Sequence, residues 1–196
     1  MRQQFNTIII GTNGTGKTSL LLKIISAYGA QKKRVLLLDN DGLERKYSKI
    51  DIIEESELIR FTGTKRLFID DINFFVRFKN VFFNREKRVM FNGLLVDDDA
   101  GTHLSRRDEI LLEILRRRRQ ANLDVITVFH GLSEVPPSLW TFCTSLILFK
   151  TVDGYERLEK NLPSNRINDF KVLVKKVNEH KSPFYFEELK FKEISF

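Results

Sequence analysis

Residues 5–18 read Phe5-Asn6-Thr7-Ile8-Ile9-Ile10-Gly11-Thr12-Asn13-Gly14-Thr15-Gly16-Lys17-Thr18. The first six residues form a short apolar run typical of a buried strand, and the last eight fit the pattern GxxxxGK[ST]. A helical pattern runs from Thr18 to Tyr28, and Gly29 provides a stop. Strand, glycine-rich turn and helix in this order predict a phosphate-binding loop.

Each residue type in this loop has a chemical role. Glycines let the backbone wrap the phosphates, while the amide N–H groups at the helix start point at them. Lys17 is expected to reach the β and γ phosphates of ATP, and the Thr18 hydroxyl is expected to ligate Mg²⁺. No Asn-Lys-x-Asp guanine signature occurs, which favours ATP over GTP. The expected nucleotide-binding residues are Gly11, Thr12, Asn13, Gly14, Thr15, Gly16, Lys17, Thr18 and Ser19.

A carboxylate at the end of a buried strand is the second part that such a site needs, because it holds Mg²⁺ through water. Three segments place acids after apolar residues: Leu38-Asp39, Ile69-Asp70-Asp71 and Leu94-Leu95-Val96-Asp97-Asp98. The first follows the phosphate-loop helix directly, and the second reads better as a helix cap. The third therefore predicts Asp97 as the Mg²⁺-side carboxylate and Asp98 as the base or water-orienting group. The alternative, that Asp98 and Asp99 merely begin a polar loop, stays open.

Short apolar runs alternate with longer helical patterns along the chain, which predicts βαβ units and a parallel sheet. Strands are expected at 5–10, 34–39, 94–98, 125–129, 145–149 and 183–186. Helices are expected at 18–28, from a cap at Asp71 to about Phe83, from Ser105 or Arg106 to Ala121, and around 166–177. The segment from about Asp41 to Thr64 is polar and irregular. The predicted fold class is α/β: a P-loop NTPase (RecA/ASCE-like) three-layer sandwich with a mostly parallel central sheet.

No linker, repeat or low-complexity segment interrupts the 196 residues, so a single domain is expected over 1–196. Its core would cover about 5–150, and a helix and a strand would extend it over about 151–196. One cysteine, Cys143, rules out a disulfide framework and suits a reducing interior compartment. No run approaches the roughly 18 apolar residues of a membrane span, so no span is expected.

Basic residues outnumber acidic ones by 33 to 26, which gives a net charge of +7. This balance is compatible with a polyanionic partner, since Lys and Arg contacts to phosphates supply sequence-independent affinity for nucleic acid. Charge alone does not separate this interpretation from that of an ordinary soluble basic protein.

Two further features carry possible chemistry. The run Arg116-Arg117-Arg118-Arg119 lies at the end of a predicted helix, where successive residues advance by about 100°, so the four cannot share one solvated face. One of them could serve as an arginine finger on another subunit's γ-phosphate, and the alternative is a solvated helix end. His130 follows the strand 125–129 at the edge where parallel sheets bind ligands, where it could sense the γ-phosphate.

The order of these parts resembles the HerA–FtsK superfamily of DNA-pumping ATPases. The resemblance covers about Phe5 to Phe149 and is most specific over Arg116 to Pro137, where arginines, a short apolar strand, a polar residue and the loop Gly131-Leu132-Ser133-Glu134-Val135-Pro136-Pro137 follow one another. Matched by position, Arg116 and Arg119 fall on the family's arginines and His130 on its sensor glutamine. The sequence departs from the family where His130 replaces that glutamine and where Asp98 replaces a glutamate.

As a bare single domain, the chain looks most like the genome-packaging ATPases of membrane-containing icosahedral viruses. The resemblance implies an ATP- and Mg²⁺-dependent motor that translocates double-stranded DNA independently of sequence and works as a homo-oligomeric ring. It also implies capsid or membrane vertex proteins as partners. The expected location is the host cytoplasm or the virion, without secretion.

Two other functions use the same loop. A small-molecule kinase for nucleosides or nucleotides needs an arginine-bearing lid, which Arg77, Arg85 and Arg88 could furnish. A nucleotide-gated binding module would bind ATP without useful turnover. DNA-stimulated phosphate release separates the motor from both.

Overall fold

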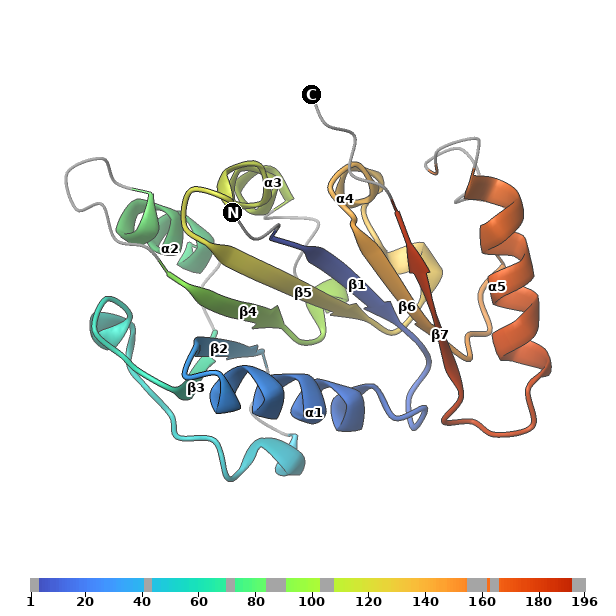
Figure 1. The fold of residues 1–196 in the computed structure, drawn as a ribbon, viewed down its shortest axis with the longest axis horizontal. Coiled ribbons are helices and arrows are strands. Elements are labelled where there is room, and N and C mark those ends of the chain that lie inside the picture. Colours follow the sequence, from blue (N-terminus) through green and yellow to red (C-terminus); the bar gives the residue numbers. More distant parts are fainter. Residues whose placement is uncertain are drawn as a thin grey trace.

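The computed structural model describes residues 4–40, 44–69, 73–83, 91–102, 108–154, 162 and 166–191. A central sheet runs through the molecule, with helices on both of its faces (Figure 1). Within the described residues, no helix combines the length and apolar character that crossing a bilayer needs.

The sheet has seven strands in the order β3-β2-β4-β5-β1-β6-β7. The strands are β1 (Asn6–Ile10), β2 (Arg34–Asp39), β3 (Thr64–Phe68), β4 (Gly93–Asp97), β5 (Leu123–Phe129), β6 (Ser145–Phe149) and β7 (Phe186–Lys190). The first six pair in parallel, and β7 pairs antiparallel with β6. The predicted α/β fold with a mostly parallel sheet is therefore confirmed.

The helices divide between the two faces of the sheet. They are α1 (Lys17–Ala30), α2 (Phe74–Phe82), α3 (Asp108–Arg117), α4 (Pro137–Trp140) and α5 (Ile167–Glu179). Short 3-10 turns are η1 (Arg45–Tyr47), η2 (Glu55–Glu57), η3 (Ala100–Thr102) and η5 (Leu132–Glu134). Helix α1 covers one face, while α2, α3 and α4 cover the other (Figure 1).

Alternation along the strands decides which side chain meets which layer. In β2, Val35 and Leu37 pack into the cluster that contains α1, and Leu36 and Leu38 pack into the cluster that contains α2 and α3. Both sets are fully buried. The continuous apolar runs read from the sequence are thus strands covered on both faces, as parallel sheets require.

Two strands differ from the sequence expectation. The strand expected at 183–186 begins at Phe186 instead, because Ser182 and Tyr185 form a turn before it. Strand β3 falls just after the segment that was expected to be irregular, where Lys65 and Arg66 hide the apolar pattern. Arg66 is nevertheless buried, and its guanidinium lies 3.4 Å from the carboxylate of Asp39 on β2.

Candidate nucleotide site

The glycine-rich segment 11–18 connects β1 to α1 and takes the shape that its glycines allow. Gly16 precedes α1 with φ of 97°, a left-handed conformation that favours glycine. A Cβ atom at Gly11 would lie 2.5 Å from the Cβ of Phe149, so only glycine fits beside β6. The loop is therefore packed closely against the sheet.

Lys17 is folded into this loop. Its side chain is 8% exposed, and its ammonium donates to the backbone carbonyls of Gly11 and Thr12, the latter at 3.1 Å. Burial lowers the pKa of Lys17, and the nearby carboxylates of Asp98 and Asp99 oppose that shift. The cation is thus partly desolvated at a point where phosphate oxygens can replace the two carbonyls.

The strand alternation separates the acids that follow β4. Leu94 and Val96 face α1, whereas Leu95 faces the opposite layer. Asp97 shares the side of Leu95, is fully buried and does not line the cavity beside Lys17. Asp98 comes next on the α1 side and does line that cavity. Asp97 nevertheless lies next to the cavity, because its Oδ1 accepts from the side-chain amide of Asn40, a lining residue, at 3.4 Å. Its role as the Mg²⁺-side carboxylate stays a prediction.

Asp98 is held by several donors. The hydroxyl of Tyr47, on η1, donates to Oδ2 of Asp98 at 2.6 Å, and the backbone N–H of Asp99 donates to Oδ1 at 3.2 Å. The amide of Asn40 donates to the backbone carbonyl of Asp98. Burial raises the pKa of the Asp98 carboxyl, and the hydrogen bond from Tyr47 counters part of that rise. This carboxylate is thus oriented by its neighbours before any ligand binds.

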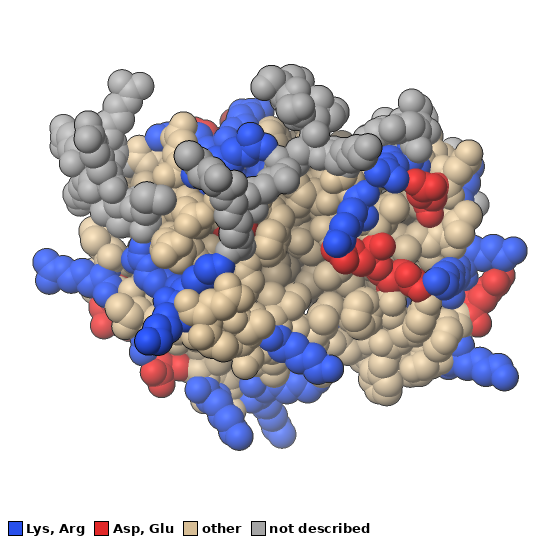
Figure 2. All heavy atoms as spheres, viewed as in Figure 1, with Lys and Arg blue, Asp and Glu red and all other residues tan. Residues whose placement is uncertain are grey.

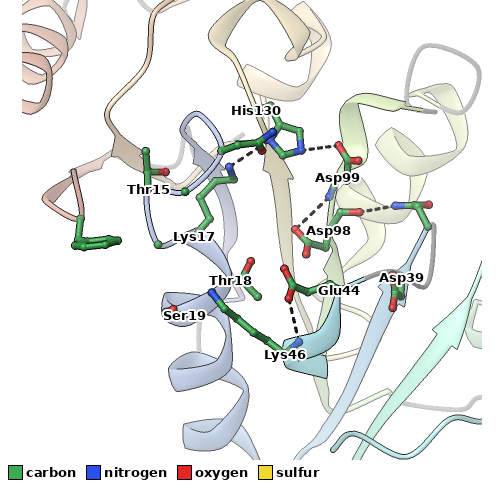
Figure 3. Close-up of a pocket in the computed structure, with 15 residues that line it drawn as sticks. Thr15, Lys17, Thr18, Ser19, Asp39, Glu44, Lys46, Asp98, Asp99 and His130 are labelled. Atoms are coloured by element: carbon green, nitrogen blue, oxygen red, sulfur yellow. Dashed lines mark hydrogen bonds and ion pairs between the residues drawn. The ribbon is translucent and has the colours of Figure 1, made fainter. Parts of the chain in front are cut away.

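His130 bridges the lysine and the next acid. Its Nδ1 lies 3.3 Å from the ammonium of Lys17, and its Nε2 lies 3.1 Å from Oδ1 of Asp99. Because an ammonium group only donates, Nδ1 must be the acceptor and Nε2 the hydrogen-bearing nitrogen. Figure 3 shows the ring between these two side chains. His130 thus follows β5 at the carboxyl edge of the sheet and lines the cavity, and its role as a sensor stays a prediction.

The loop that follows His130 is fixed from both ends. The carboxylate of Glu134 accepts from the backbone N–H of His130 at 2.9 Å. Asp153 accepts from the N–H and the hydroxyl of Ser133 at 3.2 and 2.9 Å. A Cβ at Gly131 would lie 2.2 Å from Asp153, so this glycine permits the close approach.

A cavity of about 380 Å³ lies between these groups. Residues 13–19 of the loop and helix start form one wall, and His130, Asp98 and Asp99 form another. Asp39, which ends one of the acid segments considered in the sequence, also lines the cavity. The sequence did not single out four further lining residues: Asn40, Glu44, Lys46 and Phe184. Asp39 and Asn40 end β2 at the same edge of the sheet, which is a signal that the sequence contains. Lys46 and Phe184 lie on a turn and a loop whose approach to the site no local pattern indicates.

The chain matches the model of one protein family, described as Poxvirus A32 protein, over residues 1–182. The chain belongs to the Poxvirus A32 protein family. No curated protein matches the chain in sequence.

Solved structures with the same fold come from packaging and secretion proteins. The genome packaging NTPase B204 of Sulfolobus turreted icosahedral virus 2, in complex with AMPPCP, has a TM-score of 0.72 at 20% identity, over 95% of this chain and 92% of that chain. B204 of Sulfolobus turreted icosahedral virus, described as a DNA-packaging ATPase, gives 0.70 at 19% identity, over 97% and 94%. The type VII secretion ATPase EccC of Thermomonospora curvata gives 0.53 at 15% identity, over 78% and 21%. These matches confirm the predicted P-loop ATPase fold.

The four arginines lie at the other edge of the sheet, and none of them lines the cavity. Arg116 and Arg119 are exposed, and the guanidinium of Arg116 lies 5.5 Å from the ring centre of Phe142. Arg118 is buried and donates to the carbonyl of Leu115 at 2.7 Å, so the run does not share one solvated face. Strand β5 then leads to the cavity over seven residues, about 20 Å at about 3.3 Å each.

Of the remaining residues named from the sequence, Arg77 is described by the structure and does not line the cavity. Arg77 pairs with Glu55 through two of its nitrogens, so it is engaged away from the cavity. Arg85, Arg88, Asp70 and Asp71 lie outside the described residues.

Proposed function

We propose that this chain is an ATP-hydrolysing motor that packages double-stranded viral DNA. One observation supports this most: Lys17, Asp98, Asp99 and His130, from three separate segments, face one cavity beside the phosphate loop. The family and the fold add support, because B204 is described as a genome packaging NTPase and was solved with AMPPCP and with ATP-γS. Among the residues that the structure describes, the two rival functions, kinase and binding module, gain no specific contact.

The residues that line the cavity fit a magnesium–nucleotide complex. Thr18 offers a hydroxyl and Asp98 a carboxylate, and oxygen ligands of this kind suit Mg²⁺. When bound, the ion would neutralise the charge that builds up on the β and γ phosphates. We therefore assign the Mg²⁺-side role, first expected of Asp97, to Asp98. Lys17 provides the fixed cation on the phosphates.

Asp99 then becomes the residue that orients and deprotonates the attacking water. In that step the water oxygen bonds to the γ-phosphorus, the bond to the ADP oxygen breaks, and the water proton passes to the Asp99 carboxylate. His130 holds Asp99 through Nε2 and contacts Lys17 through Nδ1. A γ-phosphate that draws Lys17 forward would thus change the hydrogen bonding of His130, which is how this residue would sense the nucleotide.

The proposed motor works as a ring of identical subunits. A homo-oligomeric ring would place exposed Arg116 or Arg119 of one subunit near the nucleotide of the next, which neither can reach within its own subunit. Capsid or membrane vertex proteins would anchor the ring, in the host cytoplasm or in the virion.

The positive charge supports sequence-independent contact with DNA. On the face shown in Figure 2, Lys and Arg side chains are spread along the lower edge and both flanks. Contacts between such side chains and phosphates release counterions, so affinity should fall steeply as salt rises.

Phosphate release measured with and without duplex DNA, over a range of salt, tests the function. We expect DNA of any sequence to stimulate hydrolysis, and we expect this stimulation to disappear at high salt. The Lys17→Ala variant is the matched control for contaminating ATPases. Hydrolysis that ignores DNA at low salt, or transfer of phosphate to a nucleoside, would contradict the proposal.

A further inference from the structure

The side chain of Phe184 is unusually exposed for a phenylalanine of this protein. Its side chain is 64% exposed, more than that of any other phenylalanine in the described part of the chain. Most of those phenylalanines are buried in the core. Phe184 lies in the connection between α5 and β7 and lines the cavity beside the phosphate loop. An exposed aromatic ring at the border of a nucleotide site is a candidate ligand contact.

The connection that carries Phe184 is well ordered by local contacts. The hydroxyl of Ser182 accepts from the N–H of Phe184 at 3.2 Å, and the N–H of Tyr185 donates to the carbonyl of Ser182 at 3.3 Å. The ring of Tyr185 stacks on that of His180, with centroids 3.8 Å apart and planes 16° apart. Phe184 is therefore presented by a defined turn.

The position of Phe184 complements the phosphate-binding groups. A Cβ at Gly16 would lie 3.4 Å from Cδ1 of Phe184, so the ring adjoins the loop near the start of α1. Along the sheet, Asp98 follows β4 and His130 follows β5, on one side of β1, whereas β7 lies on the other side. The β and γ phosphates belong beside Lys17, Asp98 and His130. The opposite end of a nucleotide therefore extends toward β7.

We propose that Phe184 stacks on the nucleobase of the bound nucleotide. The inference rests on the proposed function, because it needs ATP in the phosphate loop. Base–aromatic stacking uses the π-face that every base has, so Phe184 adds affinity without choosing between bases. Removing such a ring weakens binding by about ten- to a hundred-fold.

The experiment compares two ligands that share the phosphates and differ in the base. Calorimetry would measure the Kd of ATP and of inorganic tripolyphosphate, both with Mg²⁺, for wild type, Phe184→Ala and Phe68→Ala. Phe68 is a matched control, since it is a 43% exposed phenylalanine on β3 at the far end of the sheet. We expect Phe184→Ala to weaken ATP binding at least about ten-fold while tripolyphosphate binding stays unchanged. Phe68→Ala should change neither.

A second variant gives a signal that does not depend on loss of affinity. Phe184→Trp should retain ATP binding, and its fluorescence should be quenched by ATP and not by tripolyphosphate, against the constant background of buried Trp140. Equal weakening of both ligands in Phe184→Ala would overturn the inference, because the ring would then shield the phosphates. Unchanged ATP binding would overturn it as well, and would leave the proposed function intact. A wild-type protein that binds neither ligand would instead overturn both.

Discussion

The polar residues at the two edges of the sheet have different roles. At the carboxyl edge, side chains from β1, β4 and β5 or the loops after them converge on one cavity, although Lys17, Asp98 and His130 are far apart in sequence. At the amino edge, charged residues serve mainly the fold: Arg118 is buried against Leu115, and Arg117 donates to the carbonyl of Phe83 at 2.8 Å. The ligand-binding residues of a parallel sheet thus lie at its carboxyl edge. The arginines at the amino edge can therefore act on a nucleotide only if that nucleotide is bound to another subunit.

The largest effect expected at the carboxyl edge is that of Lys17→Ala. Loss of the buried ammonium leaves the phosphates without a fixed cation in a largely enclosed loop, so ATP hydrolysis should fall by more than about 10³-fold. Phosphate release and calorimetric ATP binding measure the two consequences separately. Lys23→Ala, an exposed lysine on the same helix, is the matched control and should behave as wild type. Turnover that survives in Lys17→Ala would remove the central claim.

At the amino edge, Arg119→Ala tests whether an exposed arginine acts across a subunit boundary. ATP affinity should persist, because Lys17 and Thr18 of the same chain are untouched. DNA-stimulated hydrolysis should fall, on the order of 10³-fold at the upper end. Mixing Arg119→Ala with Lys17→Ala subunits should restore some activity, since each supplies at alternate interfaces what the other lacks.

Arg116→Ala is the companion variant in that experiment. If it shows the loss and the rescue in place of Arg119→Ala, the arginine acts across the interface and only the choice of residue changes. Near-normal rates for both variants, with no rescue on mixing, would leave the run with a structural role alone.

The structure explains why the acids after β4 were harder to assign than the phosphate loop. GxxxxGK[ST] fixes each residue by spacing alone, and the surrounding strand and helix were found where the sequence predicted them. In contrast, a shift of one residue in a strand moves a side chain to the other face of the sheet. The buried run before Asp97 is apolar on both faces, so no alternation in the sequence shows which of the acids faces α1.

The elements that escaped prediction share a physical cause. Strand β3 contains Lys65 and Arg66, and β7 alternates exposed with half-buried residues at the end of the sheet, so neither shows the continuous apolar run of the inner strands. The approach of η1 and of Phe184 to the cavity depends on tertiary packing. Local patterns cannot report contacts of that kind.

Smaller effects are expected from substitutions of Asp97, Asp98 and Asp99, and these effects should differ from one acid to the next. Asp99→Asn should keep ATP bound and slow hydrolysis by about 10²-fold, because the water loses its proton acceptor. Asp98→Asn should instead raise the Mg²⁺ concentration needed for half-maximal activity. Asp97→Asn, whose side chain does not line the cavity, should leave that Mg²⁺ requirement unchanged. A shifted Mg²⁺ titration in Asp97→Asn alone would restore the first interpretation of the sequence.

The smallest expected effect concerns stability without any ligand. Burial holds the pKa of Asp98 above its ordinary value of 3.8, so the native state binds this proton more tightly than the unfolded chain does. The stability that this group contributes is therefore fully present below that value and is lost as the pH rises through the raised native pKa. Asparagine cannot ionise, and its other effects, including any change in the hydrogen bond from Tyr47, add an offset that does not depend on pH.

The Tm of Asp98→Asn minus that of wild type should consequently increase from about pH 4.5 to 8, by a few degrees at most. Thermal unfolding followed by circular dichroism, in buffers without nucleotide or divalent cations, measures this difference. Asp51→Asn is the control of opposite sign, because the hydrogen bond from Lys65 lowers the pKa of that exposed carboxyl. Its Tm difference should be smaller, owing to solvent screening. It should fall as the pH rises toward about 4.5 and stay nearly flat above that, because a pKa lowered from 3.8 changes stability only at lower pH. A Tm difference for Asp98→Asn that stays flat or declines as the pH rises would contradict this prediction. It would show that the hydrogen-bond donors around Asp98 fully stabilise its ionised carboxylate, so that the empty site carries no cost in stability.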